Sequence, residues 1–226
     1  MVGSVGTVLH TLNGGSSWTR LTSTASSENL MDVYFATPDT GWVVGAGGLI
    51  LSTTDCGKHW RRTLRGGVTL NSVMFAGTKD GWAVGDNGIV LGTHDRGVTW
   101  FTVPYATSQT LKGLWRHDTE KAVAVGAGGV VLRTSATPDS VAWALGNVGA
   151  EYQLEGVCLA DTSTGFAVGL NSAAGVVLRT SDGGETWAPQ TASSQFRLRG
   201  VFFLDARRGW VVGDNGTIRH TTSGGE

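Results

Sequence analysis

The residues with the clearest chemical potential are arginines, which concentrate in two stretches of the chain. One group lies within a single repeat and consists of Arg197, Arg199, Arg207 and Arg208. The second group lies along a polar turn and the strand after it, and consists of Lys58, Arg61, Arg62 and Arg65. A guanidinium makes planar, bidentate contacts with carboxylates, so both groups are predicted to bind acidic segments of a protein partner. Ordinary solvated surface charge is the alternative interpretation.

The other polar residues show no spacing typical of a catalytic or metal site. No two of the five histidines have metal-ligand spacing on one element. No Ser-His-Asp or Cys-His arrangement is apparent, and the short glycine-rich turns lack the lysine of a phosphate loop. We therefore expect no enzyme activity, no metal and no cofactor.

Composition and charge exclude several other classes of function. The 226 residues include 35 Gly and 4 Pro, and the formal net charge of −1 gives no global attraction for nucleic acid or anionic lipid. No apolar run is long enough to span a bilayer, and residues 1–4 do not resemble a signal peptide. The two cysteines form no disulfide framework; Cys158 is predicted in the core and Cys56 in an exposed turn.

A polar turn with the pattern Ser/Thr-x-Asp-x-Gly-x-x-Trp recurs along the chain. Copies run from Thr53 to Trp60, Thr93 to Trp100 and Thr180 to Trp187, with an Asn version from Thr11 to Trp18. The carboxylate can accept backbone N–H bonds across the turn, glycine tolerates positive φ, and tryptophan buries an apolar face beneath it. The predicted structural residues are Asn13, Trp18, Asp55, Trp60, Asp95, Trp100, Asp182 and Trp187. A metal or sugar contact through the three aspartates is the alternative.

A second motif, Gly-aromatic-Val/Ala-Val-Gly, sets the period of the chain. Its closing glycines are Gly3, Gly45, Gly85, Gly126, Gly169 and Gly213, spaced by 42, 40, 41, 43 and 44 residues. This period matches a propeller blade and excludes helical repeats of about 33 to 34 residues. In the first full repeat, β-branched and aromatic runs bounded by Gly, Asp or Asn predict four strands, at 30–35, 42–44, 49–53 and 60–63.

The first strand of each repeat is apolar on both faces, so both sides must be covered by neighbouring blades. One small column, Asp32, Ser72, Gly113, Gly156 and Gly200, predicts close packing there. We expect one all-β domain over residues 1–226, a β-propeller of four-stranded antiparallel blades. Five blades are expected, with N- and C-terminal strands sharing one blade in which 18–21 complete the last repeat. One strand is then surplus, which leaves an open arc or self-association as alternatives.

Together the two motifs resemble the Ycf48/HCF136-like photosystem II assembly factors, a family of BNR-repeat (Asp-box) propellers. The resemblance covers nearly the whole chain. It implies a non-catalytic scaffold that holds membrane-protein subunits, in the periplasm or thylakoid lumen. Asp boxes also occur in sialidases, but Tyr34, Tyr105 and Tyr152 show no partner pattern for a nucleophile. A glycan-binding sialidase-like module and an engineered or excised propeller without a ligand are the alternatives.

Overall fold

A computed structural model of the chain describes residues 1–21, 27–64, 66–104, 107–116, 121–137, 140–190 and 194–225. These residues form β-strands and four 3-10 turns, η1 to η4, which confirms the predicted all-β class. Among the described residues, no helix is long and apolar enough to cross a membrane. The chain divides into two compact units, Met1–Pro104 and Tyr105–Glu226, and the prediction of a single domain stays a prediction.

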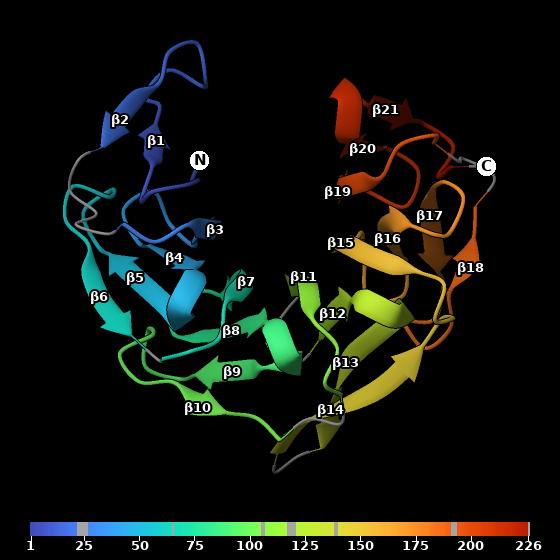
Figure 1. Cartoon of the computed structure of the whole chain (residues 1–226), viewed down its shortest axis with the longest axis horizontal. Helices are drawn as coiled ribbons and strands as arrows, with labels where there is room; N and C mark the ends of the chain where they lie inside the picture. The colour runs from blue at the N-terminus through green and yellow to red at the C-terminus, as the bar shows by residue number, and fades with distance from the viewer. Residues whose placement is uncertain are drawn as a thin grey trace. The chain divides into compact units, whose positions relative to one another are not determined.

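The first unit contains three antiparallel sheets (Figure 1). A two-stranded sheet pairs β1 (Val8–His10) with β2 (Thr19–Leu21). The next sheet has the order β3 (Leu30–Phe35), β4 (Gly41–Gly45), β5 (Leu49–Thr53) and β6 (Arg61–Leu64). The third has the order β7 (Leu70–Ala76), β8 (Asp80–Gly85), β9 (Val90–Thr93) and β10 (Phe101–Thr102).

The second unit also contains three antiparallel sheets. The first comprises β11 (Leu111–Arg116), β12 (Ala122–Gly126), β13 (Val130–Thr137) and β14 (Ser140–Asn147). The second comprises β15 (Gln153–Leu159), β16 (Gly165–Leu170), β17 (Gly175–Thr180) and β18 (Ala188–Pro189). The third comprises β19 (Leu198–Phe203), β20 (Gly209–Gly213) and β21 (Ile218–Thr221). In the expanded fourth repeat, β13 and β14 form a long hairpin. Other repeats have at this place the polar turn with the pattern Ser/Thr-x-Asp-x-Gly-x-x-Trp, which we call the Asp turn.

In the five sheets of three or four strands, the glycine that closes the second strand is required by close packing, whereas a Cβ on Gly3 would meet nothing within 4 Å. At Gly85 the backbone is extended, with φ −167°, so its conformation does not call for glycine. A Cβ atom there would lie 2.0 Å from the carbonyl oxygen of Thr69, which accepts a hydrogen bond from the Asp86 N–H at 2.9 Å. The equivalent Cβ at Gly169 would lie 2.0 Å from the Gln153 oxygen. The periodic glycine therefore lies where the end of the second strand contacts the residue that precedes the first strand of the same sheet.

Successive sheets within each unit bury the apolar faces predicted from the sequence. In the first unit, Trp42 of β4 stacks on Phe75 of β7 with ring centroids 3.5 Å apart. In the second, Phe166 of β16 stacks on Phe203 of β19 at the same separation. This face-to-face packing of neighbouring sheets agrees with the predicted blade architecture.

The column of small residues in the first strands has the close contacts predicted for it. A Cβ on Gly113 would lie 2.9 Å from the Cα atom of Gly156 in the next sheet. In the first unit, the Asp32 carboxylate accepts hydrogen bonds across the sheets from the Ser72 hydroxyl at 2.8 Å and the Val73 N–H at 3.0 Å. Burial raises the pKa of Asp32 despite these bonds. Neighbouring first strands thus leave room only for glycine or a small polar side chain.

One expectation about a cysteine needs correction, and one about the chain ends stays a prediction. Among the described strands, β2 pairs with β1 in the first unit and β21 pairs with β20 in the second, and a blade shared by the two chain ends stays a prediction. Cys56 is half-buried rather than exposed, and Cys158 is buried as predicted.

Candidate protein-binding surface

The recurring Asp turns share one hydrogen-bond pattern. The Asp95 carboxylate accepts the Thr93 hydroxyl at 2.9 Å and the Thr99 N–H at 2.9 Å, and the Thr93 hydroxyl accepts the Gly97 N–H at 3.0 Å. The equivalent bond to the residue four positions on is 2.9 Å long at Asn13, Asp55 and Asp182. The side-chain oxygens take the place of backbone carbonyls as hydrogen-bond acceptors across the turn.

The same bonds keep the carboxylates of these turns ionised. The backbone N–H and side chain of His59 are the main causes that lower the pKa of Asp55 to about 2. The hydroxyl and N–H of Thr99 lower the pKa of Asp95 to about 2, and those of Thr186 do so for Asp182. Each carboxylate therefore accepts hydrogen bonds from groups of its own turn, and these bonds hold the backbone of the turn in place.

The tryptophan side chains of the four Asp turns differ in how far they are buried. The Trp100 indole is buried, and its N–H donates to the Gly97 carbonyl at 3.2 Å. The Trp187 indole N–H donates to Gly184 at the same distance, and Trp60 packs edge-on against Phe35. Trp18, which follows the turn between β1 and β2, is 42% exposed.

The first arginine group is divided between opposite ends of one strand. Arg197 and Arg199 lie at the start of β19, whereas Arg207 and Arg208 lie in the turn after its end. Two carboxylates engage the first pair: Glu155 contacts Arg197 at 3.3 Å, and Asp214 accepts from Arg199 at 2.5 and 3.2 Å. The predicted single cluster is therefore two separate pairs.

The second pair of this group also has an acidic partner. Asp205 accepts the backbone N–H groups of Arg207 and Arg208 at 2.9 Å and the Arg208 guanidinium at 2.7 Å. The Arg207 guanidinium makes no ion pair with any described residue. Of the four arginines in this repeat, only Arg207 can bind a carboxylate of a partner without first breaking an ion pair with a described residue.

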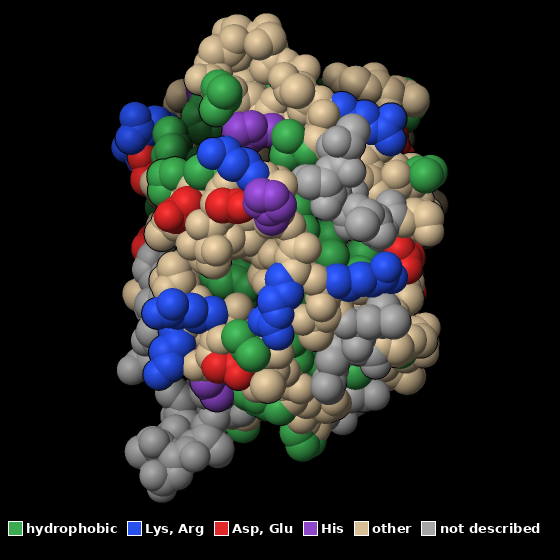
Figure 2. All heavy atoms as spheres, turned by 90° about the vertical axis from the view of Figure 1, so that its left-hand side faces the viewer, with side chains coloured by type: hydrophobic (Ala, Val, Ile, Leu, Met, Phe, Trp, Pro, Cys, Tyr) green, Lys and Arg blue, Asp and Glu red, His purple; other side chains and the backbone are tan. Residues whose placement is uncertain are grey.

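In the second group, Arg61 and Arg62 lie on β6 and Lys58 lies in the turn before it, where side chains of both charges mix. Figure 2 looks onto the side of Figure 1 where β2 and β6 lie, and separate Lys and Arg side chains lie among Asp, Glu and His there. Arg62 forms an ion pair with Glu28 at 2.5 Å, whereas Arg61 is exposed and forms none with the described residues. Arg65 lies outside the described residues.

A groove in the first unit brings a further arginine to Arg61. Its cavity of 510 Å³ is lined by Arg61 and His59, by Trp42 and Trp60, and by Arg96 from the next Asp turn. Arg96 is exposed, and no carboxylate among the described residues pairs with it. Trp42 is buried, and its indole N–H donates to the Arg96 carbonyl at 3.0 Å. Two guanidinium groups without a described ion pair thus lie beside the half-buried Trp60 indole, an arrangement that can bind a carboxylate and an apolar group together.

Sequence reasoning missed Arg96, because its position in the Asp turn is variable and nothing in the repeat marks it. A signal was available for another arginine, Arg219 on β21. The equivalent position in four other repeats is a buried leucine: Leu51, Leu91, Leu132 and Leu178. The replacement of leucine by arginine indicates a different environment at this position in the last repeat.

The other polar residues form no recognisable reaction centre in the described part of the chain. No group of three His, Cys, Asp or Glu side chains there could hold a metal ion. His59 and His94 contact Asp55 and Asp80 at 2.7 Å on the exposed surface. His117 and Tyr105 lie outside the described residues.

Comparisons with solved structures identify the fold. Similar chains include YCF48 bound to a D1 peptide (18% identity, 98% of this chain and 87% of that chain, TM-score 0.59). They also include YCF48 from Cyanidioschyzon merolae (19%, 97% and 90%, TM-score 0.63). Virginiamycin B lyase from Staphylococcus aureus is similar too (13%, 97% and 82%, TM-score 0.70). At these identities the likeness establishes the propeller fold and no activity.

The comparison with protein families is more specific. No curated protein matches the chain in sequence. The model of the family described as photosynthesis system II assembly factor YCF48 matches residues 22–136 and 134–226, which is almost the whole chain. This agrees with the resemblance carried by the Asp turns and the Gly-Trp-Val-Val-Gly motif. The chain therefore belongs to the photosystem II assembly factor YCF48 family.

Proposed function

We propose that this chain is a non-catalytic scaffold that binds a segment of a membrane-protein subunit during assembly of photosystem II. The observation that carries the proposal is family membership over nearly the whole sequence. A YCF48 protein of the same fold binds a D1 peptide, which makes a peptide segment the expected kind of ligand.

The groove at Arg61 and Arg96 is the proposed contact for a carboxylate of that segment. Both guanidinium groups lack an acidic partner among the described residues, so neither must give up an ion pair to bind. The adjacent Trp60, which is half-buried, supplies apolar surface for a neighbouring side chain. Arg207 is a second proposed contact, whereas Arg62, Arg197, Arg199 and Arg208 would have to exchange a carboxylate first.

Catalysis is not part of the proposal, although propellers of this shape include enzymes such as the lyase above. The support is the bonding of the Asp-turn carboxylates, which are occupied by backbone and hydroxyl groups of their own turns. Such groups are poorly placed to act as general acids or nucleophiles.

The test is the affinity of the chain for a fluorescently labelled D1 peptide at two salt concentrations. Replacing Arg61 and Arg96 together by Ala should weaken binding about tenfold or more, equivalent to about 1.4 kcal/mol, and should reduce the effect of salt. Arg62→Ala is the matched control, because Arg62 already pairs with Glu28.

A second variant examines the other arginine group. If Arg197, Arg199, Arg207 and Arg208 are all replaced by Ala and affinity is unchanged, that repeat takes no part in binding. If neither set of replacements alters affinity, the proposal of arginine-mediated recognition fails. If the wild-type chain does not bind the peptide at all, the proposed ligand is wrong.

A further inference from the structure

The backbone of Arg96 has a conformation that favours glycine. Its φ is +67°, in the left-handed region. Two of the other Asp turns have glycine at the equivalent position, Gly14 and Gly183, and the third has Cys56. This conformation is unfavourable for a residue with a Cβ atom, so an arginine here needs other contacts to hold it. Residues kept in such conformations cluster at ligand-binding sites, where the surrounding structure fixes them.

Two hydrogen bonds hold the Arg96 backbone, and one of them comes from the neighbouring sheet. The Arg96 N–H donates to the Lys79 carbonyl at 3.0 Å, within its own sheet. The Arg96 carbonyl accepts the indole N–H of Trp42, on β4, at 3.0 Å. A Cβ atom on Gly97 would lie 2.8 Å from the Trp42 Nε1 atom, so the indole lies directly against the turn. Trp42 is buried, and a buried indole N–H requires an acceptor such as this carbonyl.

The second unit contains the same contact without the hydrogen bond. Val123 has in β12 the position that Trp42 has in β4. A Cβ atom on Gly184 would lie 3.4 Å from the Val123 Cγ2 atom, so Val123 also lies against the next Asp turn. Valine has no N–H to donate, and this turn has Gly183 at the position of Arg96. The indole donor is thus present where the turn carries arginine, and an apolar side chain takes its place where the turn carries glycine.

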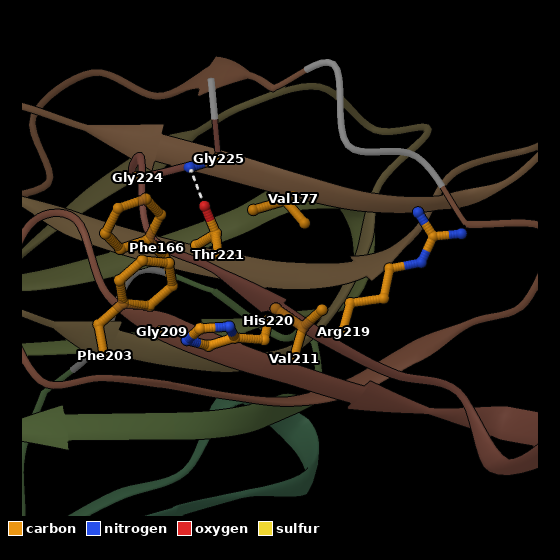
Figure 3. Close-up of a pocket in the computed structure, with 10 residues that line it drawn as sticks. All are labelled: Phe166, Val177, Phe203, Gly209, Val211, Arg219, His220, Thr221, Gly224 and Gly225. Carbon is orange, nitrogen blue, oxygen red and sulfur yellow. Dashed lines mark hydrogen bonds between the residues drawn. The ribbon is translucent and has the colours of Figure 1, made fainter.

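The stacking of the Trp42 ring can be separated from the hydrogen bond of its N–H. Trp42 stacks on Phe75 with ring centroids 3.5 Å apart and 10° between the planes. The equivalent residue of β16 is Phe166, which stacks on Phe203 at 3.5 Å and 5°. Figure 3 shows these two phenylalanine rings face to face. A phenylalanine at position 42 therefore keeps a stacked ring and removes the donor to Arg96.

We propose that Trp42 is a positioning residue for the groove, because its indole N–H fixes the backbone from which the Arg96 guanidinium reaches a carboxylate of the bound segment. The guanidinium pairs with no carboxylate among the described residues, so its place in the groove depends on the backbone that carries it. A fixed backbone also leaves fewer conformations to be lost on binding. This role rests on the proposed function, since it concerns the same groove.

The experiment measures the affinity of the labelled D1 peptide for the wild-type chain, Trp42→Phe, Arg96→Ala and the double variant, at two salt concentrations. Each single change should weaken binding about threefold or more and reduce the effect of salt, because each takes the Arg96 charge from the site. The double variant should bind within about twofold of Arg96→Ala, since both changes remove one contact. Trp82→Phe is the matched control, because Trp82 has the equivalent position in β8 and does not line the groove.

A second measurement needs no peptide. In the wild type, the NMR order parameter of the Arg96 amide should be about 0.85, as in rigid backbone, and a value below about 0.6 would overturn the proposal. The order parameter should fall in Trp42→Phe and stay unchanged in Trp82→Phe. An Arg96 amide as rigid in Trp42→Phe as in the wild type would show that the indole N–H does not position it.

The outcomes distinguish a failure of the Trp42 role from a failure of the proposed function. Wild-type affinity in Trp42→Phe, or losses that add in the double variant, would overturn the positioning role and leave the arginine contact standing. A loss of affinity in Trp42→Phe with an unchanged effect of salt would indicate a general structural effect and would also overturn it. Wild-type affinity in Arg96→Ala would refute the contact at Arg96 itself, and the role of Trp42 with it.

Discussion

The glycine that ends β8 offers a sharp test of how the repeats pack. Gly85→Ala adds one methyl group at an extended backbone position that any residue can adopt. The new Cβ would lie 2.0 Å from the Thr69 carbonyl oxygen and 2.9 Å from the Leu70 Cα atom. Both neighbours are backbone atoms, so neither can rotate away as a side chain could.

The expected loss of folding stability depends on which atoms must move to make room for the methyl group. Overpacking a tight site costs about 1 to 3 kcal/mol. Displacing the Thr69 carbonyl also weakens its hydrogen bond from the Asp86 N–H, worth about 1 kcal/mol. Gly85→Ala should therefore destabilise the protein by about 3 kcal/mol, a large part of the 5 to 15 kcal/mol typical of a domain.

Gly77→Ala is the control for the loss of glycine as such. Gly77 is exposed, has φ +62° and would meet nothing within 4 Å, so only the left-handed backbone penalty of about 1 to 2 kcal/mol applies. Urea unfolding followed by tryptophan fluorescence should give clearly lower midpoints for Gly85→Ala than for Gly77→Ala. Equal midpoints would refute the explanation by close packing.

Three further predictions concern single side chains. Trp100→Ala should destabilise by about 3 to 5 kcal/mol, because the indole is buried between two sheets, whereas Trp18→Ala should cost below about 1 kcal/mol; calorimetry would compare their melting temperatures. The Asp182 carboxylate, with its pKa lowered to about 2, should contribute stability above about pH 4 that is lost as the pH falls toward 2. Asp182→Asn should therefore reduce the difference between the midpoints of urea unfolding at pH 2 and pH 7, and an unchanged difference would count against the bonding described. Burial raises the pKa of Cys158 to about 11, so a thiol reagent at pH 8 should modify Cys56 first and Cys158 only on unfolding; equal rates would contradict this.

The sequence was a good guide to the blades because each period repeats the same physical constraints. Gly85 and its equivalents could be found by spacing alone, although the reason, close contact with a carbonyl, required coordinates. The first strand of each repeat was likewise predicted to be covered on both faces because it is apolar on both, and Val73 in the first strand of its sheet is buried. Strand identity and sheet order therefore follow from local patterns.

The chain ends and the binding surface were less predictable. A sequence pattern that predicts a strand does not specify its partner strand, and the pairing of β2 with β1 became evident only from the structure. Charge counting placed Arg199 and Arg208 in one group, but they lie at opposite ends of β19 and each already has a carboxylate. Whether an arginine is free depends on contacts distant in sequence, which composition does not record.

Hydrogen exchange of the chain with and without the D1 peptide of the proposed function tests the central claim most directly, because it locates the binding surface without mutation. Slower exchange is predicted in β6 and in the 93–100 turn, the segments that carry Arg61 and Arg96. Protection confined to other segments, or no protection at saturating peptide, would contradict the account.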